Sequence, residues 1–128
     1  MSTERGPRPI LVVDDERFFH IIIAEALKGQ VEIVAAVQDL SNALEALARL
    51  DTRAGIISDL KLTAKGLEGM AILEHAIRKG FRDLILFTST PGEVPKAWLE
   101  KYPQVQLVNK TGLRPIMEAV AKWNVSNG

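Results

Sequence analysis

The sequence predicts an α/β domain in which five parallel strands alternate with five helices, giving a doubly wound (βα)5 sheet. Two observations support this fold class. Five short apolar runs are each followed by a stretch whose apolar residues recur at spacings of three and four, the pattern of an amphipathic helix. Four of these runs are also followed directly by polar or charged residues. Strands and helices that alternate in this way form a parallel sheet covered on both faces.

The first part of the chain predicts two strand–helix units. Residues 1–9 are polar and contain Pro and Gly, and we expect a disordered arm there. The apolar runs 10–13 and 31–37 predict the first two strands. The helix between them is predicted from five apolar residues: Phe19, Ile22, Ile23, Ala26 and Leu27. Asp39 or Ser41 can cap the next helix. Its apolar positions are Leu40, Ala43, Leu44, Leu47 and Leu50.

The rest of the chain is organised around the stretch 55–60, where a buried β-branched run stops on Asp59. An acid at the end of an apolar strand is costly to desolvate unless a cation meets it. Ligands of open parallel sheets bind at the carboxyl ends of the strands, so Asp59 is predicted to lie at a binding edge. A long loop follows, and then a helix that Gly80 closes. Its apolar positions are Met70, Leu73, Ala76 and Ile77.

The last two strands are predicted at 84–87 and 105–108. Between them we expect a short helix over about residues 94–102, with Pro95 in its first turn. The final helix is predicted from its apolar positions, which are Leu113, Ile116, Met117, Val120 and Trp123.

The bulk composition, 47% hydrophobic and 25% charged, is that of an ordinary globular protein. We expect one domain over residues 10–125, with a frayed C-terminus at 126–128. Sixteen basic residues balance sixteen acidic ones, so no overall charge favours direct contact with nucleic acid or an anionic membrane. The sequence has no cysteine, no signal segment and no apolar run approaching the roughly 20 residues that span a bilayer. We therefore expect a cytoplasmic protein.

Acidic, hydroxyl and basic residues that could act together follow four of the predicted strands. They are Asp14 and Asp15 after the first, Asp59 after the third, Thr88 after the fourth and Lys110 after the fifth. The carboxyl ends of parallel strands open on one edge, so these residues become neighbours. Two carboxylates about 4 Å apart in a partly desolvated cleft repel by roughly 4 kcal/mol, so three acids require a cation or a proton. Oxygen ligands without histidine or cysteine favour a hard ion, and Mg²⁺ is usual where phosphate is involved.

With these residues the chain resembles the receiver domain of two-component response regulators. The matching residues are Asp14, Asp15, Asp59, Thr88 with the small Ser89 behind it, and Lys110. The intervals from Asp15 onward are 44, 29 and 22 residues, close to those of the family. Each motif alone is common in turns and helix caps, whereas all of them in this order are specific. The resemblance covers nearly the whole chain and implies a flavodoxin-like strand order, 2-1-3-4-5.

The resemblance also implies a role for each matching residue in a phosphorelay. Asp59 would be the phosphoacceptor, taking a phosphoryl group from the phosphohistidine of a sensor histidine kinase or a histidine phosphotransfer protein. Asp14, Asp15 and Asp59, with the backbone carbonyl of Lys61, would hold Mg²⁺. Lys110 would bind a phosphoryl oxygen. The domain would not be an enzyme beyond its own Mg²⁺-dependent phosphorylation and dephosphorylation.

Three positions would form the switch. Thr88, with Ser89 behind it, would move its hydroxyl onto the phosphoryl group. The family's third switch position is often aromatic and here is Leu107, so the coupled threonine–aromatic movement is not assumed. The face formed by the fourth helix, fifth strand and fifth helix would then bind a downstream protein partner, and a homodimer is compatible with this. No effector domain follows Asn124, so output is expected through protein contact, unless the chain is a piece of a larger regulator.

The loop after Asp59 departs from the family pattern. Thr63 stands where the family usually has proline, four residues after the phosphoacceptor. Leu67 replaces the usual glycine eight residues after it, with Gly66 and Gly69 on either side. The loop is therefore expected to be about two residues longer.

The lysine end of the site departs as well. Lys110 is followed by Thr111 and not by the usual proline with its cis bond, so this bond is either trans or strained. Lys61 adds a second cation beside the site.

Other functions stay open. A degenerate receiver that serves as an unphosphorylated protein-binding platform is favoured by the missing prolines and opposed by the intact acids, threonine and lysine. A Mg²⁺-dependent phosphatase with an aspartate nucleophile needs an acid two residues further on. Glu16 follows Asp14 at that distance, but Lys61 follows Asp59. Nucleotide binding would need a glycine-rich phosphate loop, which the sequence lacks.

Overall fold

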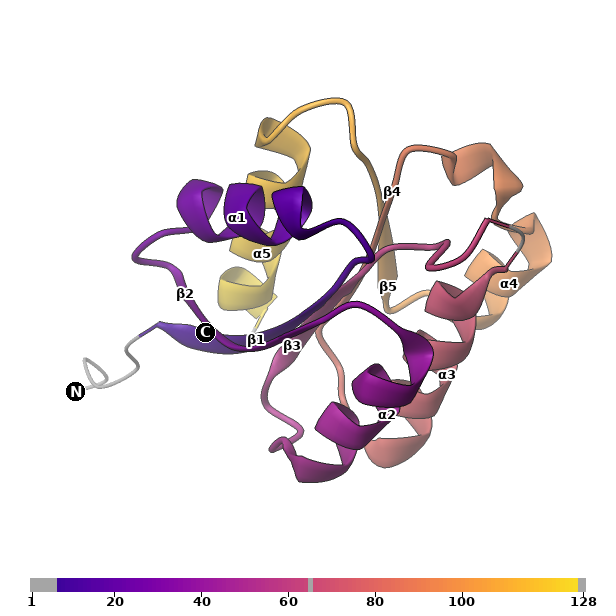
Figure 1. Ribbon diagram of the computed structural model, residues 1–128, viewed down its shortest axis with the longest axis horizontal. Coiled ribbons are helices and arrows are strands. Elements are labelled where there is room, and N and C mark those ends of the chain that lie inside the picture. Colours follow the sequence, from indigo (N-terminus) through magenta and orange to yellow (C-terminus); the bar gives the residue numbers. More distant parts are fainter. Residues whose placement is uncertain (1–6, 65, 127–128) are drawn as a thin grey trace.

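Five parallel strands form one sheet in the computed structural model, which describes residues 7–64 and 66–126. The strands are β1 (Arg8–Val13), β2 (Val31–Val37), β3 (Gly55–Ser58), β4 (Leu84–Thr88) and β5 (Val105–Asn109). Their spatial order is β2-β1-β3-β4-β5, which confirms the predicted flavodoxin-like order (Figure 1). Residues 1–6 of the predicted arm and 127–128 of the predicted frayed end lie outside the described residues.

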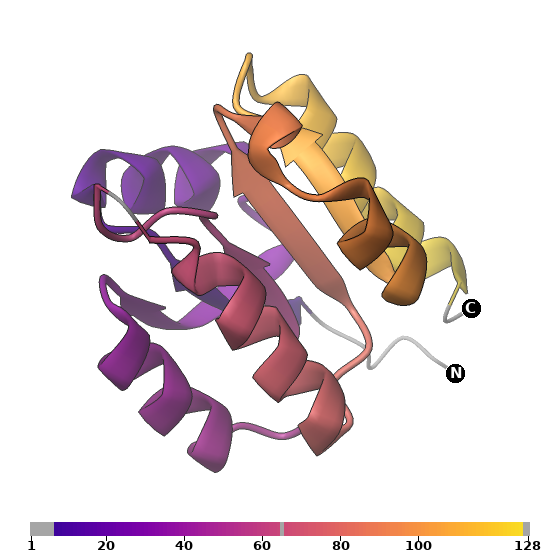
Figure 2. The ribbon, with the colours of Figure 1, turned by 90° about the vertical axis from the view of Figure 1, so that its right-hand side faces the viewer.

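Five α-helices cover the sheet on both faces. They are α1 (Arg17–Ala26), α2 (Leu40–Arg49), α3 (Glu68–Lys79), α4 (Lys96–Lys101) and α5 (Arg114–Ser126). Figures 1 and 2 show α1 and α5 on one face and α2, α3 and α4 on the other. Among the described residues, no helix is both long enough and apolar enough to cross a membrane.

Two hydrophobic cores lie on the two faces of the sheet because successive strand side chains point to opposite sides. Leu11 and Ile56 pack under α2, α3 and α4, whereas Ile10 and Ile57 pack under α1 and α5. The central strands are buried throughout, as expected of a parallel sheet with helices on both faces. The first core also contains Trp98, and the second contains Trp123.

Strand β1 begins two residues before the predicted start. The amide of Arg8 donates to the carbonyl of Gln30 at 3.1 Å, which extends the pairing with β2. The Arg8 guanidinium also forms an ion pair with Asp83 and donates to the carbonyl of Arg53 at 2.9 Å. These contacts anchor a polar residue that periodicity alone assigned to the arm.

Helix α4 is shorter than predicted. Pro95 does not lie in its first turn but precedes it as the N-cap residue in an extended conformation. Residues Pro91–Glu93 form a separate 3₁₀ turn, η2. Two prolines four residues apart divide the segment, because proline cannot donate the backbone hydrogen bond that a helix interior requires.

Candidate functional site

The carboxyl ends of β1 and β3 place two acids side by side. Val13 and Ser58 are partners in the parallel register, and Asp14 and Asp59 are the next residues along each strand. The amide of Asp59 donates to the carbonyl of Val13 at 2.8 Å, so the pairing continues past the strand ends. The amide of Asp14 donates to the carbonyl of Val37 at 3.0 Å. Backbone hydrogen bonds therefore hold both acids in place.

Asp14, Asp15 and Asp59 form an acid cluster at this edge of the sheet. Each offers a carboxylate oxygen, and the three oxygens lie within 4.8 Å of one another. Asp14 is buried, Asp59 is half-buried and Asp15 is exposed, so one side of the cluster is open to solvent. Three oxygen ligands with an open side fit Mg²⁺, which usually keeps several of its waters.

Lys110 brings one positive charge to the acid cluster. Its ammonium Nζ lies 2.7 Å from Asp14 Oδ2 and 3.2 Å from Asp59 Oδ2, and its side chain is only 5% exposed. The amide of Lys110 donates to the carbonyl of Thr88 at 2.9 Å, which continues the β4–β5 pairing by one residue. Since no described peptide bond is cis, the bond to Thr111 is trans. Lys110 thus points at both acids without the proline that usually follows it.

The pKa of Asp59 reflects these surroundings. Burial is the main cause that raises it from 3.8 to about 6. The Lys110 ammonium opposes this rise, and the Asp14 carboxylate adds to it. Buried acids with perturbed pKa values cluster at functional sites.

The three residues expected to form the switch differ in their exposure to solvent. Thr88 is buried at the end of β4, and its hydroxyl accepts a hydrogen bond from the amide of Thr90 at 3.0 Å and lies 3.2 Å from the Thr90 hydroxyl. Ser89 is exposed. Leu107 is half-buried and packs against the core under α2, α3 and α4. The hydroxyl of Thr88 is therefore hydrogen-bonded within its own loop and not to the acid cluster.

The side chain of Lys61 turns to the neighbouring loop. Its Nζ forms an ion pair with Glu93 at 2.6 Å, which links the loop after β3 to η2. Both side chains are partly exposed, so the pair contributes little to stability. Lys110, and not Lys61, is the cation in contact with the acids.

The loop between β3 and α3 is closed by a residue that the sequence analysis did not single out. Glu68, the first residue of α3, accepts hydrogen bonds from the amide of Leu62 and the hydroxyl of Thr63. Thr63, which replaces the family's proline, is thus tied to the helix by its side chain. Gly69 donates to the carbonyl of Leu60 at 2.9 Å and packs directly on the backbone after Asp59.

Two neighbours of the acid cluster come from α1. The ring of Phe19 lies under the ammonium of Lys110, whose Nζ is 3.9 Å from the ring centroid. His20 hydrogen-bonds through Nε2 to the backbone carbonyl of Asp14 at 2.8 Å. Helical spacing assigned Phe19 to the core, and no pattern in the sequence indicated that it meets a residue 91 positions away.

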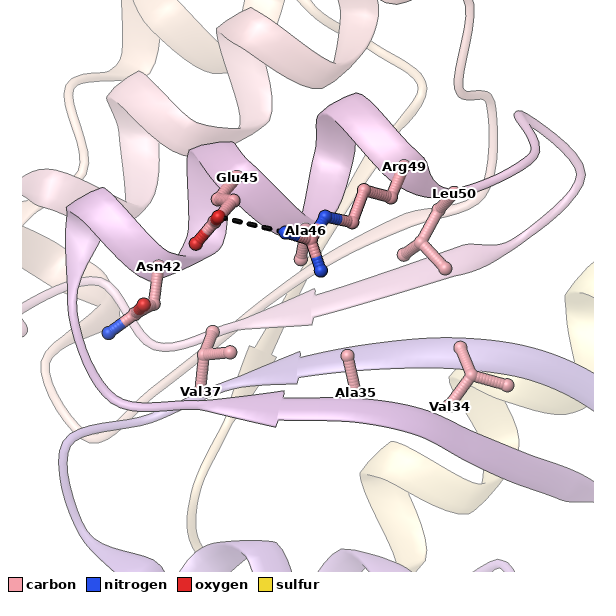
Figure 3. Close-up of a pocket in the computed structure, with 8 residues that line it drawn as sticks. All are labelled: Val34, Ala35, Val37, Asn42, Glu45, Ala46, Arg49 and Leu50. Atoms are coloured by element: carbon pink, nitrogen blue, oxygen red, sulfur yellow. Dashed lines mark hydrogen bonds and ion pairs between the residues drawn. The ribbon is translucent and has the colours of Figure 1, made fainter.

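A shallow groove of about 300 Å³ lies elsewhere, between the edge strand β2 and α2 (Figure 3). Its lining is mostly aliphatic, with an exposed ion pair between Glu45 and Arg49 at 3.0 Å along its rim. No member of the acid cluster lines it. The chemistry of the site therefore lies at the sheet edge and not in this groove.

No protein-family model matches the chain, and no curated protein matches its sequence. Solved structures do match. A response regulator receiver protein from Sinorhizobium medicae is 18% identical, with a TM-score of 0.76 over 99% of this chain and 100% of that chain. The signal receiver domain of an HD domain-containing protein from Pseudomonas fluorescens is 18% identical, with a TM-score of 0.75 over 94% of this chain and 96% of that chain.

The response regulator domain of Thermotoga maritima CheB is 17% identical, with a TM-score of 0.72 over 92% of this chain and 97% of that chain. All three likenesses span nearly the whole of both chains, although sequence identity is low. The described chain therefore has the fold of response regulator receiver domains.

Proposed function

We propose that the protein is a receiver domain that accepts a phosphoryl group on Asp59. The observation that carries the proposal is the contact of one buried ammonium, that of Lys110, with the carboxylates of both Asp14 and Asp59 at 2.7 and 3.2 Å. Three acids and a lysine from β1, β3 and β5 thus meet at one edge, which suits phosphoryl transfer because that reaction depends on positioning and charge stabilisation.

The donor would be the phosphohistidine of a sensor histidine kinase or a histidine phosphotransfer protein. A carboxylate oxygen of Asp59 attacks phosphorus, a P–O bond forms, and the P–N bond to the donor imidazole breaks. The leaving nitrogen takes up a proton, and Asp59 carries an acyl phosphate. The Lys110 ammonium, already beside Asp59, is placed to hold a phosphoryl oxygen. No further catalytic activity is proposed beyond self-phosphorylation and dephosphorylation.

Asp14, Asp15 and Asp59 would hold Mg²⁺, with the backbone carbonyl of Lys61 as a further ligand. When bound, the ion neutralises charge on the attacking carboxylate and on the phosphoryl oxygens. The chain's own contribution is the fixed backbone at Asp14 and Asp59, and an exposed Asp15 that leaves the approach to the cluster open.

Thr88 and Ser89 would respond to the phosphoryl group. The Thr88 hydroxyl would leave Thr90 for a phosphoryl oxygen, and the half-buried Leu107 on the neighbouring strand would repack. Such a movement favours one of two conformations that already coexist. The face of α4, β5 and α5 would then bind a downstream protein partner.

The second candidate is an unphosphorylated binding platform with the same fold. The observation that favours it is the position of Lys110, whose single positive charge already offsets part of the negative charge of Asp14 and Asp59 through close contacts. The Lys110 ammonium reduces the net negative charge of the cluster, and with it the attraction for a bound metal ion.

Incubation with acetyl phosphate and Mg²⁺, followed by intact mass and peptide mapping, separates the two candidates. We expect the gain of one phosphoryl group, located on Asp59, in the wild type and no gain in Asp59→Asn. Asp51→Asn, which alters an exposed acid in a surface turn, is the matched control and should be modified like the wild type. No gain with acetyl phosphate or with a phosphohistidine donor would favour the platform.

A further inference from the structure

The ammonium of Lys110 is enclosed by two carboxylates and an aromatic face. Its Nζ lies 3.9 Å from the centroid of the Phe19 ring and 5.6 Å from that of Phe87. The two rings meet edge-on, with centroids 6.2 Å apart and an interplanar angle of 89°. Phe87 is buried in β4, so the ring of Phe19 rests on a fixed support.

A cation over an aromatic face is attracted by the negative face of the ring quadrupole, and more strongly when the cation is desolvated. The Lys110 side chain is 5% exposed, so this condition is met. The ring differs from the carboxylates in one respect. Asp14 and Asp59 are also the groups proposed to bind Mg²⁺ and phosphorus, and in doing so they would release part of their hold on the ammonium.

The Phe19 ring is neutral, and it neither coordinates a hard metal ion nor reacts with a phosphoryl group. Its attraction for the ammonium therefore persists when the carboxylates change partners. This is relevant because the proline that usually follows the lysine is absent, and Lys110 is followed by Thr111 in a trans bond. The backbone after Lys110 thus lacks the constraint of that proline. The Phe19 ring can instead restrain the ammonium end of the side chain.

We propose that Phe19 is a positioning residue that holds Lys110 in place for phosphoryl transfer through a cation–π contact, supported by Phe87. The proposal rests on the proposed function for its kinetic consequence, but the contact itself is independent of it. Phe18 provides a matched control. It precedes Phe19 in α1, is 63% exposed and meets the Phe19 ring edge-on with centroids 5.5 Å apart. Among the described residues its ring makes no cation–π contact with Lys110.

The contact is tested first by NMR, without phosphorylation. Protons over an aromatic face are shifted upfield by the ring current, so the ε-methylene protons of Lys110 should be shifted upfield in the wild type. Lys110→Arg assigns the signal. The shift should be lost in Phe19→Leu and kept in Phe18→Leu and Phe19→Tyr. A Lys110 signal that is the same in Phe19→Leu as in the wild type overturns the proposal.

The kinetic consequence is tested with acetyl phosphate and Mg²⁺. Phe19→Leu should slow phosphorylation by about two- to thirtyfold, the range that corresponds to a cation–π contact, while Phe19→Tyr restores most of the rate. Phe18→Leu should react like the wild type. A wild-type rate in Phe19→Leu overturns the positioning role.

Fluorinated phenylalanines at position 19 separate the electrostatic effect of the ring from its packing. They also provide a test if the Phe19→Leu variant does not fold. Successive fluorine atoms weaken the quadrupole with little change in shape. We expect the rate to fall stepwise from phenylalanine through 3,5-difluorophenylalanine to pentafluorophenylalanine. Equal rates across this series would show that the ring only fills space, and would overturn the proposal.

If the wild type itself takes no phosphoryl group, the proposed function fails, and the NMR shift still decides whether Phe19 holds Lys110.

Discussion

Gly69 lies against the backbone of Asp59 so closely that a β-carbon on Gly69 would sit 2.0 Å from the Asp59 carbonyl oxygen and 2.8 Å from the Cα of Leu60. Its amide donates to the Leu60 carbonyl at 2.9 Å. The start of α3 is therefore seated directly on the chain that carries the proposed phosphoacceptor. In the sequence, Gly69 stands two residues after Leu67, which occupies the position where the family usually has glycine.

Gly69→Ala is expected to destabilise the protein and disturb the site. Because the β-carbon would overlap backbone atoms that cannot move independently, the expected loss is about 1–3 kcal/mol in the free energy of unfolding, measured by urea denaturation. Gly92→Ala is the control, since nothing lies within 4 Å of a β-carbon at Gly92. Equal stability of the two variants would contradict the close packing at Gly69.

The acids of the site could be predicted from the sequence because a parallel sheet brings its strand ends to one edge. Asp14 and Asp59 each follow a run of buried residues, so their proximity follows from the topology alone. Lys110 could be placed at the same edge for the same reason. The pattern of strands and helices therefore determines the proposed site more firmly than any single motif does.

Other features depend on contacts that no local pattern contains. Gly69 was visible in the sequence, but its close packing on the Asp59 carbonyl depends on the path of the loop between β3 and α3, which no local pattern specifies. Phe19 has the spacing of a core residue, and its position under Lys110 arises from the packing of α1 on the face of the sheet where Phe87 of β4 lies. The start of α4 was predicted too early because Pro95 was expected in the first turn, a position that proline tolerates, whereas it precedes the helix as the N-cap residue.

Removal of the Asp59 charge should stabilise the protein at neutral pH. The folded pKa of about 6 lies above the ordinary 3.8, so folding is favoured while Asp59 is protonated. That contribution is present below about pH 4 and is lost as the pH rises through 6. In chelator-containing buffer, Asp59→Asn should therefore exceed the wild type in stability by about 1–3 kcal/mol at pH 7.5, with little gain at pH 4.

Asp51→Asn is the control for this experiment. Asp51 is exposed, and a side-chain hydrogen bond from Arg53 lowers its pKa, so its removal should give no gain at pH 7.5. Thermal unfolding at several pH values measures both differences. A stability gain for Asp59→Asn that does not change between pH 4 and pH 7.5 would contradict the raised pKa.

Mg²⁺ should stabilise the wild type through the acid cluster. At a concentration ten times the dissociation constant, binding to the folded state adds about 1.4 kcal/mol, which corresponds to a rise of about 5 °C in Tm for a chain of this size. Asp14→Asn should lose most of this shift, because it removes a carboxylate from the cluster. Asp39→Asn, which changes a helix cap outside the cluster, should keep it. A full shift in Asp14→Asn would place the ion elsewhere.

Trp98 should report a movement of α4 when Asp59 is phosphorylated. Its indole Nε1 donates to Glu74 Oε2 of α3 at 2.6 Å, and its ring lies 5.1 Å from that of Tyr102. If the face of α4, β5 and α5 rearranges, this hydrogen bond is strained or broken, and the indole environment changes.

The measurement uses Trp123→Phe, so that Trp98 is the sole tryptophan, with acetyl phosphate and Mg²⁺ added. We expect a change in emission that is absent when Asp59→Asn is added to the same background. Glu74→Ala should shift the emission without phosphorylation and cost about 1 kcal/mol, whereas Glu74→Gln keeps an acceptor and should change it less. Emission that does not change while mass spectrometry records full phosphorylation would mean that α4 stays in place, and output would then have to use another face of the domain.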